Sequence, residues 1–308
     1  MKKTALSLAI AAVLPTFAHA EKVEVEMPEF YGKVNVSFQS TNEGDESITE
    51  VVSNASRLGV KGKIELNHGL QGVYQAEYQT AVDDGDNGGS PFSQRNIFAG
   101  IKGGFGQVKI GMFDTPLKKA QKKVDLFNDY DGDIKSAISK SDKRKEDMVQ
   151  YNTPNMAGFV ATVANISSEV DGGKDGLSSS LTFSKDKFYA AAAYDSDVRA
   201  EDVNVIRLVA QYSIADITLG ALWESEDGDA STENDGWVAS AAYKATFDVT
   251  LKAQYGQSDI VADEAKTYSL GADYKLAKTA KVFAFVTSEE FGDDTSNDYY
   301  AVGTEFKF

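Results

Sequence analysis

The amino-acid sequence predicts an all-β protein, namely a transmembrane antiparallel β-barrel of sixteen strands. Most of the chain consists of segments of about ten residues in which apolar and polar side chains alternate, the period of a strand with one apolar face. Tight turns and longer acidic loops follow one another between these segments, as in outer-membrane barrels. A single charge-dense stretch of about thirty residues, 114–145, interrupts this pattern and is long enough to indicate a function of its own.

The first twenty residues have the pattern of a secretory signal. Two lysines make the start basic, a short apolar run extends from Ala5 to Leu14, and Ala18-His19-Ala20 forms an A-x-A cleavage site. This run is too short to cross a bilayer as a helix, and no later stretch reaches eighteen consecutive apolar residues. We therefore expect residues 1–20 to be removed and residues 21–308 to cross the membrane with strands.

Five strands are expected before the long stretch. Phe30, Val34 and Val36 alternate with polar residues in the first, and the turn at 67–69 separates the second from the third. Two acidic stretches, 41–50 and 83–90, are interpreted as loops. The five predicted strands cover residues 30–39, 57–66, 70–80, 95–103 and 107–113.

Eleven strands follow, and their faces decide between a barrel and a soluble β-sandwich. Opposite faces carry Lys, Arg, Gln, Asp and Glu, which a sandwich core could not hold unpaired. The last strand puts Val302, Phe306 and Phe308 on one face, and an outward phenylalanine at the end resembles the terminal signal of bacterial outer-membrane barrels. Aromatic residues also lie near strand ends on the presumed outer face, as membrane girdles require: Tyr212, Trp223, Trp237, Tyr243, Tyr255 and Tyr274.

Composition excludes several classes of function. The chain has no cysteine, which rules out disulfides, thiolate metal sites and cysteine nucleophiles. The formal net charge of −16 is unfavourable for nucleic acid, which requires a basic face. Beyond the signal the only histidine is His68, in an expected tight turn, where it is poorly placed as the base of a serine hydrolase. We expect neither enzymatic activity nor a cofactor.

Four strings resemble the Gram-negative general porin family: FYGKVNV (30–36), SRLGVKGKIEL (56–66), QRNIFAGIKGGFGQVKIG (94–111) and QYNTPNMAGF (150–159). The resemblance spans essentially the whole of 21–308. It implies a sixteen-stranded barrel in the outer membrane, usually a homotrimer among lipid and lipopolysaccharide, that passes ions and small hydrophilic solutes passively. It also implies that the third external loop, here 114–145, bends inward and presents an acidic edge to basic residues on the wall.

The resemblance places that basic wall at Lys33, Arg57 and Arg95, one in each of the first three strings. The alternation agrees for Lys33 and Arg57, because each lies beside an apolar residue of the opposite face. For each of these positions the alternative is a solvated wall residue without a role in selectivity. Three further basic residues satisfy the same alternation and are candidates for the inner face: Lys61, Lys109 and Arg207.

The acidic edge is predicted within the string DLFNDYDGD. Asp125, Asp129 and Asp133 are four residues apart and would share one face of a helix, with Asp131 between them. The alternatives are a solvated acidic loop and a calcium site. The string beginning at Asp129 starts like an EF-hand, but isoleucine and lysine stand where the glycine and the last glutamate are required, so no metal is expected.

Two departures from the family bear on ion preference. Met112 and Gln150 stand where the family often has arginines, so the positive wall is thinner than usual. Because rings of acids favour cations, we predict a cation-preferring pore. Four lysines of the long stretch would oppose this preference if they face the lumen: Lys118, Lys119, Lys122 and Lys123.

Three other functions remain open at this point. A channel preferring sugars, oligosaccharides or phosphate would need an aromatic track or an arginine ladder, for which Phe127 and Tyr130 are the available aromatics in the loop. An adhesin or structural barrel would use the acidic loops for contacts, alone or beside pore activity. An outer-membrane enzyme built on an aspartate pair has no positive support in the sequence.

Overall fold

The structure is a computed structural model that describes residues 26–44, 46–85, 89–228, 233–293 and 295–308. The predicted signal at 1–20 lies outside the described residues. Among the helices of the described part, none combines the length and the apolar character needed to cross a membrane.

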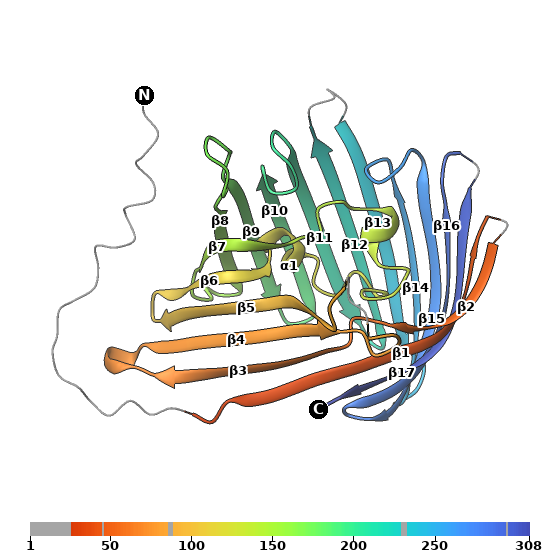
Figure 1. Ribbon diagram of the computed structural model, residues 1–308, viewed down its shortest axis with the longest axis horizontal. Helices are drawn as coiled ribbons and strands as arrows, with labels where there is room; N and C mark the ends of the chain where they lie inside the picture. Colours follow the sequence, from red (N-terminus) through yellow and green to blue (C-terminus); the bar gives the residue numbers. More distant parts are fainter. Residues whose placement is uncertain (1–25, 45, 86–88, 229–232, 294) are drawn as a thin grey trace.

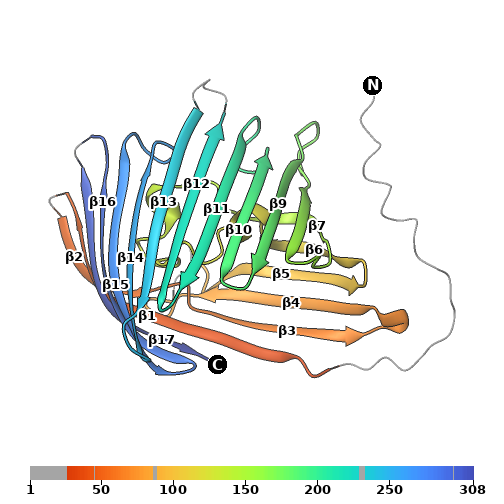
Figure 2. The ribbon, with the colours of Figure 1, turned by 180° about the vertical axis from the view of Figure 1, so that it is seen from behind.

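The strands form one antiparallel sheet that closes on itself (Figures 1 and 2). Each strand pairs with the next along the chain, and β17 returns to pair with β1. β2 and β3 both pair with β1, and together they form one barrel strand interrupted at residues 54–56. The described residues therefore form a sixteen-stranded barrel, which confirms the predicted fold and excludes the sandwich.

The strand segments are β1 (Glu29–Glu43), β2 (Glu46–Ser53), β3 (Arg57–Glu65), β4 (Gln71–Thr80), β5 (Phe92–Gly103), β6 (Gly106–Asp114), β7 (Arg144–Asn152), β8 (Phe159–Ile166), β9 (Gly176–Lys185), β10 (Phe188–Ser196), β11 (Asn204–Ile214), β12 (Ile217–Asp227), β13 (Glu233–Lys244), β14 (Val249–Ser258), β15 (Ala265–Ala277), β16 (Ala280–Glu290) and β17 (Ser296–Lys307). Because neighbours are antiparallel, the tight turns that follow β3, β5, β7, β9, β11, β13 and β15 gather at one mouth of the barrel, and the longer connections gather at the other. The turn after β3 is the short 3₁₀ helix η1 (Asn67–Gly69).

One predicted loop is in fact strand. Residues 41–50 were expected to form an acidic loop, but Thr41 to Glu43 continue β1, and β2 pairs with it from Glu46 onward. The acidic side chains do not prevent strand formation here, because residues 46–51 of this hairpin are exposed and keep their charges in water. Backbone pairing then needs no apolar face.

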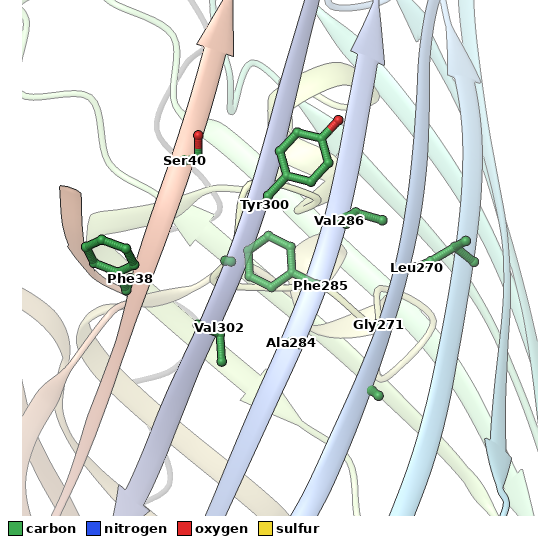
Figure 3. Close-up of a pocket in the computed structure, with 11 residues that line it drawn as sticks. Phe38, Ser40, Leu270, Gly271, Ala284, Phe285, Val286, Tyr300 and Val302 are labelled. Atoms are coloured by element: carbon green, nitrogen blue, oxygen red, sulfur yellow. The ribbon is translucent and has the colours of Figure 1, made fainter. Parts of the chain in front are cut away.

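The outer face of the barrel is apolar, as predicted. Leu181, Leu208 and Leu270 are exposed there, and so are five of the six predicted girdle aromatics. The sixth, Tyr255, is partly covered, with its ring centroid 5.2 Å from that of Trp237 and 4.9 Å from that of Tyr268. A groove of about 590 Å³ crosses this face over β1, β15, β16 and β17, where small residues such as Ala284 lie between larger side chains (Figure 3). An apolar belt of this kind is what lipid contact requires.

Segment 114–145 does not remain a plain loop. It contains two short helices, α1 (Pro116–Ala120) and α2 (Ile134–Ala137), and it packs on the buried faces of strands across the barrel. One apolar cluster joins residues such as Leu117, Val124 and Ile138 to Tyr189 and Leu222 of β10 and β12. The inner face, expected to be polar, is therefore partly apolar where the segment covers it.

A second apolar cluster fixes the tip of the segment. The ring of Tyr130 lies 4.9 Å from that of Phe283, and the ring of Phe127 lies 6.2 Å from that of Phe285. Gly271 makes the close approach possible, because a β-carbon there would lie 3.0 Å from Cε1 of Phe127. Apolar contacts therefore hold the segment at two places, one against β10 and β12 and the other, at its tip, against β16.

Candidate pore constriction

Asp129 is the carboxylate that meets the predicted basic wall. Its Oδ2 lies 2.8 Å from Nζ of Lys33 and 3.5 Å from Nη2 of Arg57. Lys33 and Arg57 are register partners on β1 and β3, so the pairing of two neighbouring strands sets both cations side by side. The Asp129 side chain keeps 18% of its surface exposed, whereas that of Lys33 keeps 6%.

The local fold of the segment aims this carboxylate. Asp129 has a φ of 74°, in the left-handed region that aspartate tolerates better than most residues. Its N–H donates to Oδ2 of Asp133 at 3.1 Å, and the N–H of Tyr130 donates to the carbonyl of Phe127 at 2.8 Å. Burial acts to raise the pKa of Asp129, but Lys33 and Arg57 outweigh it and hold the pKa below its usual value. The carboxylate therefore carries its charge at neutral pH.

Asp125 and Asp133 have a different role, although they were predicted on the same edge. Each keeps only 3% of its surface exposed. Asp125 accepts hydrogen bonds from the N–H groups of Phe127 at 3.1 Å and Ile134 at 3.2 Å, and from Nε2 of Gln254 on β14 at 3.2 Å. Asp133 is the N-cap of α2 and accepts from the N–H of Lys135 at 3.0 Å. Burial raises the pKa of both carboxyls, and for Asp125 the proximity of Asp133 raises it further.

Asp131 has a different neighbour on the wall. Its side chain is half-buried, and burial raises its pKa, although a hydrogen bond from Gln39 acts in the opposite direction. It therefore lies within hydrogen-bonding reach of Gln39 on β1. The carboxylates that a calcium site would use have other partners. Asp129 pairs with Lys33 and Arg57, and Asp133 caps α2.

Arg95 belongs to the basic wall but pairs with a wall acid. Its Nε lies 3.0 Å from Oε1 of Glu77, and its Nη1 donates to Oε1 of Gln79 at 2.7 Å. Nδ2 of the next residue, Asn96, reaches the same Glu77 oxygen at 3.3 Å. Two consecutive residues of β5 thus point inward, which is possible because a β-bulge interrupts the register between Ala76 and Tyr78 of β4.

Bulges recur through this part of the wall. One extra residue lies in the break between β2 and β3, one in β5, and one in β7 near Asp147, where the pairing with β6 shifts. These are alternate strands of the barrel, and bulges commonly re-aim side chains beside functional sites. The basic wall is therefore built on an irregular part of the sheet, while the pairings from β8 to β14 are regular.

Two predicted wall lysines lie elsewhere. Lys61 is half-exposed near the short-turn mouth, with its Nζ 3.1 Å from Oε1 of Glu29, so it does not meet the acidic tip. Lys109 is buried on the inner face as the alternation predicted, with its ammonium 4.9 Å from the ring centroid of Phe98 and 3.6 Å from that of Phe113. Cation–π contacts take the place of an acidic partner.

The structure also shows charged groups that the sequence reasoning missed. Arg144, at the start of β7, places Nη2 2.9 Å from Oδ1 of Asp114. Lys252 and Lys281 share Asp273, each with an N–O distance of 3.0 Å, beside the aromatic tip. Alternation alone would have found Lys252, which stands between Leu251 and Ala253, but nothing in the pattern shows that the loop reaches it.

The lysines of the segment divide into two groups. Lys118 is paired, with Nζ 3.1 Å from Oδ2 of Asp142. Lys119, Lys122 and Lys123 are exposed. Gln150, one of the two departures, is buried and donates to Oδ1 of Asn152 at 2.6 Å. Arg144, Lys252 and Lys281 therefore add cations to this region beyond those predicted from the sequence.

A closed sixteen-stranded barrel with an apolar outer belt and a charged inner site defines the class of transmembrane β-barrel proteins. The comparison with known families is specific within that class: residues 5–294 match the family described as Gram-negative porin. The chain belongs to this family and is an outer-membrane protein.

Individual relatives agree. The major outer membrane protein P.IB of Neisseria sicca is 32% identical over 171 residues, which cover 53% of this chain and 46% of that protein. The chain therefore spans about half the length of that relative. The P.IB protein of Neisseria meningitidis serogroup A is 25% identical over 317 residues, covering 90% of each chain.

Two solved structures share the fold. The anion-selective porin from Comamonas acidovorans superposes with a TM-score of 0.77 at 18% identity, covering 93% of this chain and 100% of that one. The Salmonella typhi OmpF complex with daunomycin gives a TM-score of 0.76 at 19% identity, covering 91% and 97%. Likenesses at this level of identity define the architecture, and the ion preference has to be argued from the residues of this chain.

Proposed function

We propose that this porin gives ions and small hydrophilic solutes a passive, water-filled route across the outer membrane, and that segment 114–145 forms its narrowest part. The observation that carries the proposal is the contact of Asp129 with Lys33 and Arg57, because it joins the segment to the wall of β1 and β3. Packing on β10 and β12 supports the same placement from the other side.

At this constriction the chemistry is electrostatic. Asp129 of the segment contacts Lys33 and Arg57 of the wall, and Arg95 of β5 pairs with Glu77, so fixed charges of both signs are gathered at this place. Fixed opposite charges orient water and dipolar solutes, and their sum biases the choice between cations and anions. No chemical step and no cofactor is required, because the solute moves down its own gradient.

We propose a cation preference, supported chiefly by the mouth with the long loops. Two of the four predicted acids are buried in the fold of the segment, which weakens the contribution of the constriction itself. Exposed acids dominate the connections at the long-loop mouth and raise the local concentration of cations. They include Glu43, Glu46, Asp83, Asp84, Asp171, Glu201, Asp202, Asp227, Asp263, Glu264, Glu290 and Asp293.

A sugar-preferring channel is the second candidate, and the aromatic residues argue against it. Such a channel needs aromatic faces exposed along the path. The inward aromatics near the tip, Phe127, Tyr130, Phe283 and Phe285, are instead buried against one another. We expect liposome swelling with neutral sugars of rising size to show a smooth size cutoff. A sharp preference for one sugar would favour the second candidate.

The family resemblance also leads us to propose a homotrimer surrounded by lipid and lipopolysaccharide. The apolar outer face is compatible with both lipid and subunit contacts, and the residues described here do not favour one part of it for assembly. Cross-linking in native outer membranes, followed by electrophoresis without heating, is expected to give a band of three subunits. A single-subunit band under these conditions would contradict the trimer.

The deciding experiment is planar-bilayer recording of the purified protein in a salt gradient. We expect ohmic single-channel steps and a reversal potential of the sign for cations. Asp129→Asn should shift that potential toward anions, because Lys33 and Arg57 lose their counter-charge. Asp125→Asn serves as the matched control, since its carboxyl is buried away from the path and should leave the potential nearly unchanged. Equal effects of both variants would contradict the site assignment, and no channels at all would contradict the function.

A further inference from the structure

Arg207 of β11 is the most deeply buried large side chain with a full charge among the described residues, and its environment is not that of a pore-lining group. It keeps 0% of its surface exposed. Its Nε donates to Oε2 of Glu224 at 2.6 Å, and its Nη2 lies 2.5 Å from the same oxygen. Glu224 is its register partner on β12, so the pair belongs to two neighbouring strands.

The rest of the guanidinium contacts segment 114–145 on both sides of its tip. We call residues 114–124 the first stem and residues 134–145 the second stem. On the first stem, Nη1 donates to the carbonyl of Leu117 at 3.4 Å and to Oε1 of Gln121 at 3.3 Å. On the second stem, Nη2 donates to Oγ of Ser139 at 2.9 Å, and Nη1 lies 3.5 Å from Oδ1 of Asp142. The hydroxyl of Ser139 donates in turn to Oε1 of Glu224 at 2.7 Å.

One side chain therefore touches two stretches of the segment that lie about twenty residues apart in the chain, together with the wall. A planar guanidinium presents five donors in a fixed fork, whereas a lysine offers one compact ammonium, so only arginine can make these contacts together. The wall does not depend on them, because β11 and β12 are already joined by a continuous ladder from Asn204 to Ile214.

We propose that Arg207 is a positioning residue that clamps both stems of segment 114–145 to β11 and β12 and so holds the constriction at one width. This inference rests on the proposed function, in which the segment limits the pore. The aromatic cluster anchors the tip at β16, and Asp129 adds a single carboxylate contact at β1 and β3, so the two stems are the parts of the segment whose position the clamp sets. Loss of the clamp should let the segment move while the barrel stays closed.

The test compares open-channel current noise in the wild type, Arg207→Lys and Arg199→Lys. Arg207→Lys keeps a cation beside Glu224 but loses the planar set of donors that contacts both stems. Arg199→Lys is the matched control, because Arg199 forms its own ion pair with Glu226 at the end of β12. We expect noise to rise several-fold in Arg207→Lys and to stay at the wild-type level in Arg199→Lys. Equal noise in all three proteins would overturn the proposal.

A reversible lock shows whether the noise comes from the segment. A β-carbon added to Gly132 at the tip would lie 2.5 Å from Oγ of Ser269 on β15 and 2.9 Å from Cβ of Phe127. A cysteine pair at 132 and 269 is therefore close enough to bridge but shifts the tip slightly, and the same cysteine pair in the otherwise wild-type protein is the reference for its noise. The chain has no other cysteine to interfere. In Arg207→Lys carrying Gly132→Cys and Ser269→Cys, we expect a quiet channel when oxidised and a noisy one after reduction. Noise that persists when oxidised would mean that Arg207 acts on something other than the segment.

Failure of the clamp and failure of the pore give different results. A wild-type protein that inserts and gives no current contradicts the proposed function, whereas a quiet Arg207→Lys channel contradicts only the clamp. Folding is checked by the mobility shift of the barrel on unheated gels. If Arg207→Lys does not fold, the double variant Gln121→Ala/Ser139→Ala and the single variant Asp142→Asn weaken the stem contacts of Arg207 on both sides while leaving the Arg207–Glu224 pair. Quiet channels from both of these variants would then overturn the proposal.

Discussion

At the scale of single residues, the aspartates of the predicted acidic edge have different roles. Asp129 holds two wall cations and keeps part of its surface in contact with solvent. Asp125 and Asp133 use their oxygens on backbone N–H groups and shape the turn that presents Asp129. Spacing along the sequence found all three, but spacing cannot tell a carboxylate that faces solvent from one that caps a helix four residues away.

The lowered pKa of Asp129 makes its contribution persistent in acid. Burial alone would raise this pKa, and the opposing charges of Lys33 and Arg57 bring it below the usual value of 3.8. The stabilisation of the tip by this carboxylate is therefore present above the usual pKa and is lost as pH falls through the lower, folded value. We expect the difference in reversal potential between wild type and Asp129→Asn to survive at pH 3.8. If it is half lost there, the carboxylate titrates as a free one.

At the scale of elements, regular alternation predicted most strands and failed at the bulges. Lys33 and Arg57 followed from the period of two, whereas Arg95 and Asn96 point to the same side although they are consecutive. Alternation of apolar and polar residues does not predict where a strand contains the extra residue of a β-bulge. The internal structure of segment 114–145 was also beyond it, because α1 and α2 depend on packing against strands that lie far away in the chain.

The cap of α2 offers a test of how the tip is built. Replacing an N-cap aspartate by alanine typically costs about 0.5–2 kcal/mol, and α2 is too short to form without tertiary support. Asp133→Ala also removes the acceptor of the Asp129 N–H. We expect faster protease cleavage within 125–140 in detergent and little change in the unfolding temperature of the barrel. Ser136→Ala, beside the cap on the same helix, is the control.

We expect the aromatic cluster around Phe127 to contribute more free energy to the position of the tip than the N-cap Asp133 does. Phe127 is fully buried against Phe285 and Tyr130, and a buried Phe→Ala change typically costs about 3–5 kcal/mol. Because the lost contacts join the segment to β16, their loss destabilises the position of the tip and not the strand pairing of the barrel. We expect Phe127→Ala to raise single-channel conductance. Phe105→Ala, in an exposed turn, should leave conductance as it is, and an unchanged Phe127→Ala channel would count against a constriction at the tip.

At the scale of the whole molecule, charge is distributed along the axis of the barrel. The long-loop mouth is strongly acidic, whereas the short-turn mouth carries many of the exposed lysines. The latter are Lys102, Lys185, Lys187, Lys244, Lys275, Lys278 and Lys307. The net charge of −16 is therefore distributed unevenly, with the acids concentrated at the long-loop mouth.

Salt separates the effect of the mouths from that of the constriction. Screening acts over about 30 Å at 0.01 M and about 3 Å at 1 M ionic strength, so charges at the mouths influence the path only in dilute salt. With the same concentration ratio across the bilayer, we expect a clear cation preference at low salt and a small one at high salt. A preference independent of salt would assign selectivity to the constriction alone.

The bulges of the wall also bear on how such a barrel changes its length during evolution. On either side of Arg95 and Asn96, Phe92 and Ile101 of β5 both face outward, so deleting Asn96 alone would restore a regular strand without turning any residue into the lipid. Deleting Phe98 from the same strand would reverse every face beyond it. Among the described strands, insertions and deletions are therefore expected to be tolerated best at 54–56, 95–96, 146–147 and 275–277, and the first three of these sites lie in the part of the wall that carries the constriction residues.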